Sequence, residues 1–144
     1  MKKLGFIVFC FIPLCSFSQT KEEYSSVMEK FTRYYNNKQS DSLYQNVFGD
    51  TTNFSKVNIF SYSDIKRLHK KLGKIKSYRY VKKYGVDIMK RPMALYDVKF
   101  SRKYEGEYFH GVTFSLDEHH KIFGLCFTTS STEIDSLIKI NRQQ

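Results

Sequence analysis

His110 is the residue whose chemistry stands out in this chain. It falls in the alternating apolar segment 107–116, a pattern that predicts a strand with one buried face. A neutral imidazole on such a face can act as a general base or hold a ligand oxygen, and a small lyase or isomerase could combine it with tyrosine hydroxyls. No Asp or Glu is expected on that face to orient the ring. We therefore favour a histidine bonded to water or to a tyrosine, and we assign no catalytic residue.

Aromatic residues are abundant, with 11 Tyr and 13 Phe but no Trp. A tyrosine ring is apolar with one polar tip, which suits the wall of a pocket for a small amphipathic ligand. The alternative is an ordinary core filled with large rings, which explains each position equally well. The residues expected to line a ligand pocket are Tyr96, Phe100, Tyr108, His110 and Phe127.

Other reactive side chains show no pattern typical of catalysis or of metal binding. His119 and His120 are neighbours in an expected turn, and ligands of one metal ion rarely lie side by side in sequence. Cys126 has no catalytic cysteine signature around it and is interpreted as a small, semi-buried residue. Paired carboxylates and a phosphate-binding loop are also absent from the sequence. We therefore expect no metal site and no cofactor, and a protein that is not an enzyme.

The first 18 residues have the composition of an export signal. Two lysines precede the apolar run 4–14, and the segment Ser-Phe-Ser at 16–18 places small residues where a signal peptidase needs them. Cleavage between Ser18 and Gln19 removes both lysines and lowers the formal net charge from +10 to +8. The apolar run is too short to span a bilayer, so we expect no transmembrane segment after cleavage. Residues 19–144 then form one domain, in the periplasm or outside the cell.

Cysteine usage supports a chain that is stabilised by packing alone. A lipid-modified cysteine needs a small residue before it, whereas Leu14 precedes Cys15 and Phe9 precedes Cys10. We therefore do not expect a lipoprotein. Both of these cysteines leave with the signal, and the one that remains cannot form an intrachain disulfide.

A basic stretch runs from residue 66 to residue 83 without a single acid. Such a surface attracts nucleic acid, anionic lipid or acidic glycan. Export argues against nucleic acid, so an anionic component of the cell envelope is the partner that we expect. The alternative is a charged helix face that is simply solvated. The residues of this basic surface patch are Lys66, Arg67, Lys70, Lys71 and Lys74.

Helical periodicity occupies the first half of the domain, and strand periodicity follows it. Apolar residues recur at helical spacing after the capping box Thr20–Glu23, again at 40–48, and in a third helix that ends at Gly73. Strands are expected at about 75–84, 93–103, 107–116 and 121–129, before a brief helix that carries Ile134, Leu137 and Ile138. Segment 50–60 fits either a short strand or an irregular crossing. This order predicts an α+β fold, with N-terminal helices on one face of a curved antiparallel meander and a short C-terminal helix.

The chain resembles small bacterial exported domains of the nuclear-transport-factor-two-like superfamily, which have cone-shaped α+β folds. The resemblance covers most of 20–130 and depends on the aromatic first helix, Leu72-Gly73-Lys74-Ile75 and the strand at 121–125. It implies a cavity between the first helix and the sheet. The superfamily includes isomerases, dehydratases, ligand carriers and adaptor domains, so the resemblance does not select a function.

Turn chemistry predicts the register of the strands and therefore their two faces. A loop around Gly106 sets Tyr96 opposite Phe114, and an even loop at 117–120 sets Val112 opposite Leu125. Alternation this regular indicates that one face packs under the helices. That inner face is expected to hold Ala94, Tyr96, Val98, Phe100, Tyr108, His110, Val112, Phe114, Leu116, Phe123, Leu125 and Phe127. The outer face is expected to hold Asp97, Lys99, Ser101, Thr113, Ser115 and Thr128, with Ile122 and Cys126 as apolar members.

These patterns favour an exported, non-enzymatic domain that binds a small amphipathic ligand or an envelope partner. The alternative is the lyase or isomerase built on His110. Ile122 and Cys126 on the outer sheet face would allow a homodimer.

Overall fold

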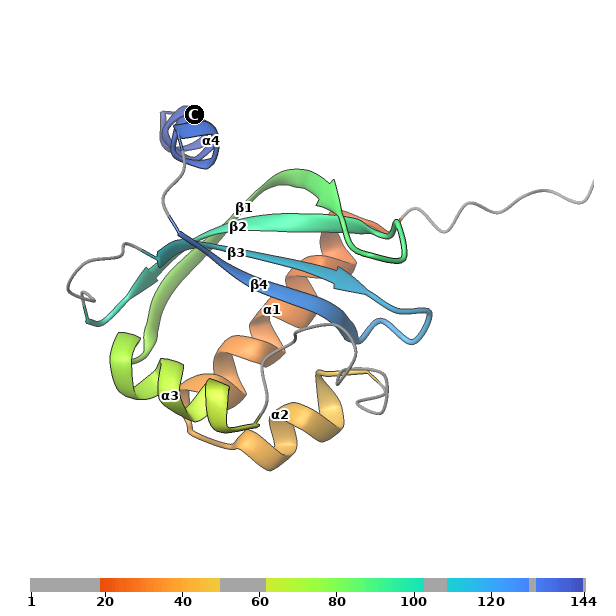
Figure 1. The fold of residues 1–144 in the computed structure, drawn as a ribbon, viewed down its shortest axis with the longest axis vertical. Coiled ribbons are helices and arrows are strands. Elements are labelled where there is room, and N and C mark those ends of the chain that lie inside the picture. The colour runs from red at the N-terminus through yellow and green to blue at the C-terminus, as the bar shows by residue number, and fades with distance from the viewer. Residues whose placement is uncertain (1–18, 50–61, 103–108, 130–131, 144) are drawn as a thin grey trace, which may run out of the picture.

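A four-stranded antiparallel meander covered by helices makes up the described part of the chain (Figure 1). The computed structural model describes residues 19–49, 62–102, 109–129 and 132–143. Its helices are α1 (Lys21–Asn36), α2 (Ser40–Asn46), α3 (Tyr62–Leu72) and α4 (Thr132–Arg142), and its strands are β1 (Ile75–Val86), β2 (Pro92–Phe100), β3 (Phe109–Leu116) and β4 (Ile122–Thr129). The predicted α+β class, the meander and the short C-terminal helix are confirmed. The export signal, segment 50–60 and Tyr108 lie outside the described residues.

Helix α1 begins where the sequence predicts. The Thr20 hydroxyl accepts from the Glu23 N–H at 3.3 Å, and the Glu23 carboxylate accepts from the Thr20 N–H at 2.7 Å. This reciprocal capping satisfies two N–H groups that have no partner inside the helix. The helix then buries one stripe against the sheet, made of Tyr24, Val27, Met28, Phe31 and Tyr35.

The core between the helices and the sheet is filled by stacked rings. Tyr96 and Phe114 are fully buried, with ring centroids 5.5 Å apart at an interplanar angle of 11°. Tyr24 meets Phe114 edge-on at 5.7 Å, and Phe31 packs at 6.4 Å from Phe127. Aromatic pairs at these separations stabilise a core beyond their buried area. The described rings therefore pack α1 directly onto β3 and β4, and Phe114 joins them to Tyr96 of β2.

The predicted register is wrong by two residues in both hairpins, although side chains away from the bulge in β4 keep their predicted faces. Tyr96 lies opposite Val112 rather than Phe114, and Val112 lies opposite Phe127 rather than Leu125. In the second hairpin the turn supplies one residue of the shift, because the Asp117 N–H donates to the Lys121 carbonyl at 2.8 Å and Leu116 then pairs with Ile122 rather than Lys121. A bulge in β4 supplies the other residue. A shift of two residues leaves each side chain on its original face, because strand side chains alternate with a period of two.

Two side chains of β4 lie elsewhere than predicted because a bulge interrupts the strand. Ser115 pairs with Gly124 but Leu116 pairs with Ile122, so Phe123 is the extra residue. Ile122 is fully buried in the main core and is not an apolar member of the outer face. The Phe123 ring is only half-buried, and the Arg91 guanidinium lies 4.0 Å above it.

The outer sheet face is also partly covered. Helix α4 lies on the side opposite α1–α3 (Figure 1), where Ile134 and Ile138 form a second small cluster with Leu95. Thr113 and Ser115, which were expected among the polar outer set, are buried. The Ser115 hydroxyl donates to Asp87 at 2.6 Å and accepts from the Gly124 N–H at 3.1 Å, so its burial leaves no unmet hydrogen bond.

Strand β1 is one edge of the sheet and is irregular along its length. Its pairing with β2 shifts register three times, between Ile75 and Ser77, between Tyr80 and Lys82, and between Lys83 and Val86. These bulges bend the strand, and Figure 1 shows it curving around the helical side.

Candidate ligand pocket between the first three helices

A pocket of about 340 Å³ opens between the end of α1, the start of α2, α3 and the end of β2. We call it the helix pocket. This volume is near the lower limit of small-molecule sites, which run from roughly 300 to 1,000 Å³. Its apolar and aromatic walls are Tyr34, Tyr35, Leu43 and Ile65, with Ser40 and His69 beside them. Its cationic side chains are Lys38, Lys66, Lys70 and Arg102.

Asn36 ties the end of α1 to the sheet and so fixes one wall. Its side-chain amide donates to the Ile75 carbonyl at 2.9 Å and accepts from the Ile75 N–H at 2.8 Å. The amide therefore completes the backbone pairing at the start of β1 in the way that a neighbouring strand would. Immediately afterwards Lys38, at φ 56°, turns the chain into α2, and this turn places Lys38 at the pocket rim.

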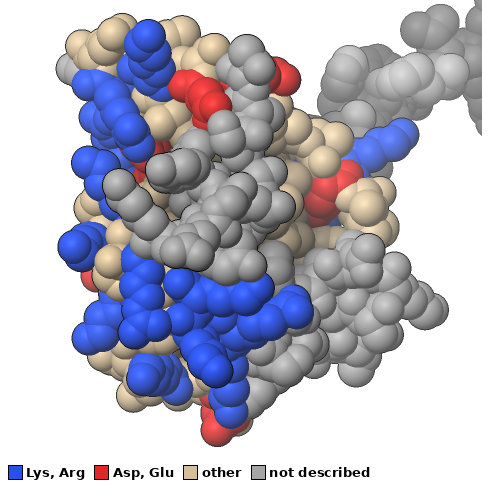
Figure 2. All heavy atoms as spheres, turned by 60° about the vertical axis from the view of Figure 1, so that its left-hand side comes forward, with Lys and Arg blue, Asp and Glu red and all other residues tan. Residues whose placement is uncertain are grey.

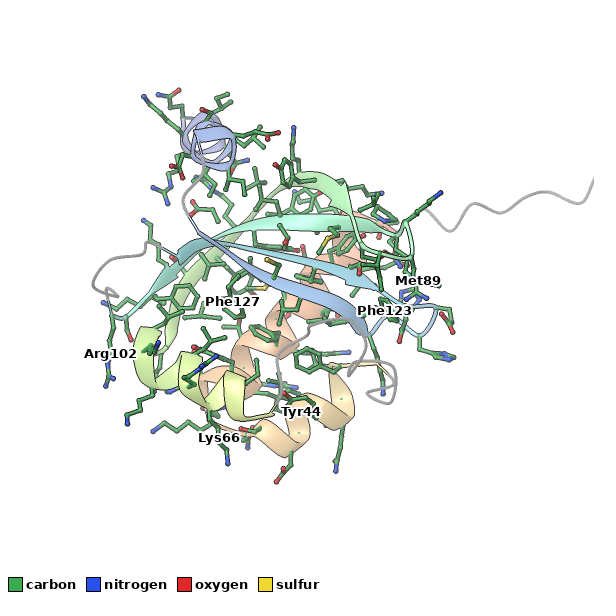
Figure 3. All side chains as sticks on the ribbon, viewed as in Figure 1. Tyr44, Lys66, Met89, Arg102, Phe123 and Phe127 are labelled. Atoms are coloured by element: carbon green, nitrogen blue, oxygen red, sulfur yellow. The ribbon has the colours of Figure 1, made fainter. Side chains whose placement is uncertain are left out.

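Gly73 and Arg102 fix the opposite wall. Gly73 has φ 74°, a conformation that side chains disfavour, and it ends α3 so that β1 can begin two residues later. The Arg102 backbone N–H donates to the Leu72 carbonyl at 2.9 Å, and its guanidinium donates to the Lys70 carbonyl at 2.7 Å. Figure 3 shows Arg102 beside α3, with Lys66 on the same helix.

Tyr35 and His69 meet in the wall of the helix pocket, with ring centroids 5.1 Å apart. Neither the Tyr35 hydroxyl nor the His69 Nε2 has a hydrogen-bond partner among the described residues, and both atoms are buried. A buried polar atom left in this state costs about 1–3 kcal/mol. The wall therefore holds two polar groups that a bound molecule could satisfy after a small shift of the side chains.

The electrostatic field of the helix pocket is positive. Desolvation lowers the pKa of His69 from 6.5, and the positive charges of Lys38 and Arg102 lower it further. His69 is therefore a neutral imidazole at pH 7. Burial raises the pKa of the Tyr35 hydroxyl, which keeps it a neutral donor. No Asp or Glu is found among the described lining residues.

The basic surface patch borders the helix pocket. Its five members are exposed on α3 and just beyond it, whereas Ile65, Leu68 and Leu72 face the core. Lys66 and Lys70 are members of both the patch and the pocket. Figure 2 shows Lys and Arg side chains gathered over one face of the molecule.

The aromatic residues named from the sequence lie elsewhere. Tyr96 and Phe127 are buried in the core, and Phe100 packs against it partly exposed. His110 belongs to β3 by its backbone, but its side chain, like the whole of Tyr108, lies outside the described part of the structure. The prediction that these five residues line one pocket therefore stays untested as a set. The three described members, Tyr96, Phe100 and Phe127, are not among the residues of the helix pocket.

Sequence reasoning missed most of the helix pocket. Tyr34, Lys38, His69 and Arg102 come from three separate segments, and no motif connects them. The available signal was limited to a histidine inside the basic stretch and two adjacent tyrosines at the end of an amphipathic helix. Only the packing of α1 against α3 brings these residues together.

Three further features bear on the chemistry of the described residues. Both oxygens of Asp97 are bound by the Arg142 guanidinium, at 2.7 and 2.8 Å. Within residues 19–49, 62–102, 109–129 and 132–143, no group of three His, Cys, Asp or Glu is placed to hold a metal ion. Cys126 was predicted to be semi-buried, and this is wrong: it is exposed on β4.

Comparison with protein-family models, with curated proteins and with solved structures finds no match to this chain. The resemblance to the nuclear-transport-factor-two-like superfamily therefore remains a prediction. None of the described helices has the length and apolar composition needed to cross a membrane.

Proposed function

We propose that this protein is a non-enzymatic binding domain that holds a small anionic amphipathic ligand in the helix pocket. One observation carries the proposal: apolar walls and four cationic side chains meet in one pocket, with no acid among the described lining residues. The export signal expected at 1–18 would bring the domain to the cell envelope, where anionic lipids and acidic glycans supply ligands of this class.

The two halves of the pocket favour different parts of such a ligand. Leu43 and Ile65 are buried and apolar, and the Tyr34 ring is half-buried beside them, so they suit a hydrocarbon or ring portion. The lysines at the rim attract an anionic head group and lose little hydration because they stay exposed. Tyr35 and His69 can add neutral hydrogen bonds to its oxygens.

No described contact favours the alternative enzyme built on His110. That reaction needs a carboxylate near the imidazole, and Asp97 is the one acid of β2, the strand that pairs with β3. Asp97 pairs with Gly111 in the register, but its carboxylate is already held by Arg142 on the α4 side of the sheet. We therefore base the proposal on binding.

The test measures binding of octyl phosphate to the chain from Gln19 onward by isothermal titration calorimetry, below the critical micelle concentration. The double variant Lys66→Gln/Lys70→Gln removes two charges from the pocket rim. The matched control, Lys71→Gln/Lys74→Gln, removes two charges from the same exposed segment but from residues outside the pocket. We expect the pocket variant to bind at least tenfold more weakly and the control to change by less than threefold.

Octanol carries only the apolar half of octyl phosphate, and inorganic phosphate carries only the anionic half. Their affinities therefore measure the two halves of the ligand separately. Both should bind more weakly than octyl phosphate. Equal losses in the two lysine variants would mean that a diffuse positive field attracts the ligand. Undetectable binding of octyl phosphate by the wild-type chain would refute the proposal.

A further inference from the structure

The turn between β1 and β2 exposes large apolar side chains that the fold does not use. Val86, Ile88 and Met89 are 60%, 66% and 60% exposed, and Ile140 on α4 is the other large apolar residue exposed to this degree in the described chain. We call Val86, Ile88, Met89 and Lys90 the β1–β2 tip. It lies at the end of the sheet remote from α3 (Figures 1 and 3).

Asp87 makes the β1–β2 tip rigid. Its carboxylate accepts from the backbone N–H groups of Met89 at 2.8 Å and Arg91 at 2.9 Å, and from the Ser115 hydroxyl. The Asp87 N–H donates to the Arg91 carbonyl, and the Lys90 N–H donates to the Asp87 carbonyl, both at 2.9 Å. These N–H, carbonyl and carboxylate groups all have hydrogen-bond partners within the protein. Moving them from water into a less polar medium therefore breaks none of these hydrogen bonds.

A second turn in the same chain shows that this geometry does not need apolar residues. The carboxylate of Asp117 accepts from the N–H groups of His119 and Lys121, both at 2.9 Å, and the Asp117 N–H donates to the Lys121 carbonyl. His120 has φ 56°, as Lys90 has φ 59°. Ile88 and Met89 correspond to Glu118 and His119 in this matching turn. Neither the turn nor the core therefore explains why residues 88 and 89 are apolar.

Cationic residues flank the β1–β2 tip in the sequence. Lys82, Lys83 and Lys90 are exposed, and Arg91 follows directly. The carboxylate of Asp87 is engaged inside the turn, and Glu118 is 3.9 Å from the Arg91 guanidinium. An apolar apex with exposed lysines on the same strand and turn matches the surface of a bilayer that contains anionic lipid, where apolar groups enter the acyl boundary and lysines meet the head groups.

The beginning of the domain lies at the same end. The Gln19 side-chain amide donates to the Leu116 carbonyl at 2.8 Å, and the Tyr24 hydroxyl donates to the Pro92 carbonyl at 2.6 Å. Gln19, the first described residue, is therefore held at the end of the sheet where β2 begins and β3 ends. We propose that the β1–β2 tip docks the domain onto anionic lipid bilayers by inserting Ile88 and Met89.

The absence of Trp from the chain permits a direct test with a single reporter. The variant Met89→Trp, in the chain from Gln19 onward, is titrated with vesicles of phosphatidylcholine and phosphatidylglycerol at 3:1. That chain contains every described core residue and lacks the apolar segment 4–14, which could itself bind lipid. We expect a blue shift of the Trp emission and its quenching by brominated acyl chains. Ile140→Trp should show neither effect, because Ile140 is similarly exposed, at 56%, but lies on α4.

Affinity for the same vesicles is then measured by co-sedimentation. Ile88→Ser/Met89→Ser should weaken binding at least tenfold, because two apolar side chains leave the bilayer, while Ile140→Ser should change it less than twofold. Unchanged binding of the double variant would assign the interaction to the basic surface patch alone and overturn the proposal. A blue shift of Met89→Trp with rising protein concentration and no vesicles would also overturn it, because a second copy of the chain would then cover the tip.

Discussion

Removing Arg142 should destabilise the protein much more than removing Asp97, although the two residues form one ion pair. The Asp97 side chain is 6% exposed, whereas that of Arg142 is 45% exposed. Removing Arg142 leaves a buried carboxylate without its cation, and breaking a buried pair in this way costs about 3 kcal/mol or more. Removing Asp97 leaves a guanidinium that can turn into water, so we expect a loss of only about 1 kcal/mol.

The assay is urea unfolding at pH 7 of wild type, Asp97→Ala, Arg142→Ala and the double variant. With a slope near 2 kcal/mol per molar urea, a loss of about 3 kcal/mol lowers the midpoint by about 1.5 M. The double variant should be more stable than Arg142→Ala, because it no longer contains the unpaired carboxylate. Lys139→Ala, an exposed residue in the last turn of the same helix, controls for the loss of a positive charge and should change stability by less than about 0.5 kcal/mol.

Equal losses in Asp97→Ala and Arg142→Ala would refute the reasoning, since they would show that both charges are equally hydrated. A smaller loss in Arg142→Ala than in Asp97→Ala would do so as well. Hydrogen exchange adds an independent readout, because Arg142→Ala should also raise the exchange of α4 amides relative to those of α1.

Three further predictions follow from the fold. The pKa of His69 is lowered from 6.5 in the native chain. As the pH drops below about 6.5, the unfolded chain therefore binds a proton more readily than the native chain does, and the free energy of unfolding falls. His69→Gln should reduce this fall between pH 7.5 and pH 5.5 in urea unfolding, and an equal fall in both proteins would contradict it. Gly73→Ala should destabilise more than Gly85→Ala by at least about 1 kcal/mol, because both glycines have positive φ but only at Gly73 would a Cβ meet the Ser101 hydroxyl; equal losses would show that this contact relaxes freely. Phe114→Ala should cost about 4 kcal/mol in the same assay, because it empties the centre of the ring cluster, and a loss under 2 kcal/mol would mean that the cluster closes over the space.

The sequence predicts the elements well because their signals are local. The capping box fixes the start of α1, and period-two alternation gives each strand to within a few residues. Register depends on turn length, which is less local. The turn at 117–121 includes Lys121 because the Asp117 carboxylate and its N–H close it, and a bulge then moves Ile122 into the core. Neither effect has a clear signature in a short polar loop.

The helix pocket could not be predicted because its residues are distant in sequence and ordinary in type. Lys66 and Lys70 were recognised as surface charge, but their role at a pocket rim depends on where Arg102 returns to α3. His69 carries no motif, and its environment is created by burial against Tyr35. Ile88 has no signal in the sequence either. Its apolar side chain stands out only in comparison with Glu118, because the two turns have the same hydrogen bonds in the structure.

The irregular course of β1 also has a consequence for solubility. A 12-residue strand at the edge of a sheet presents unpaired N–H and C=O groups that can recruit the same strand from another molecule and start a fibril. The three register shifts interrupt that row of groups, and the exposed Lys76, Arg79, Lys82 and Lys83 would bring like charges together in any stacked pair. The features that give this surface its positive charge therefore also protect the sheet against growth by strand addition.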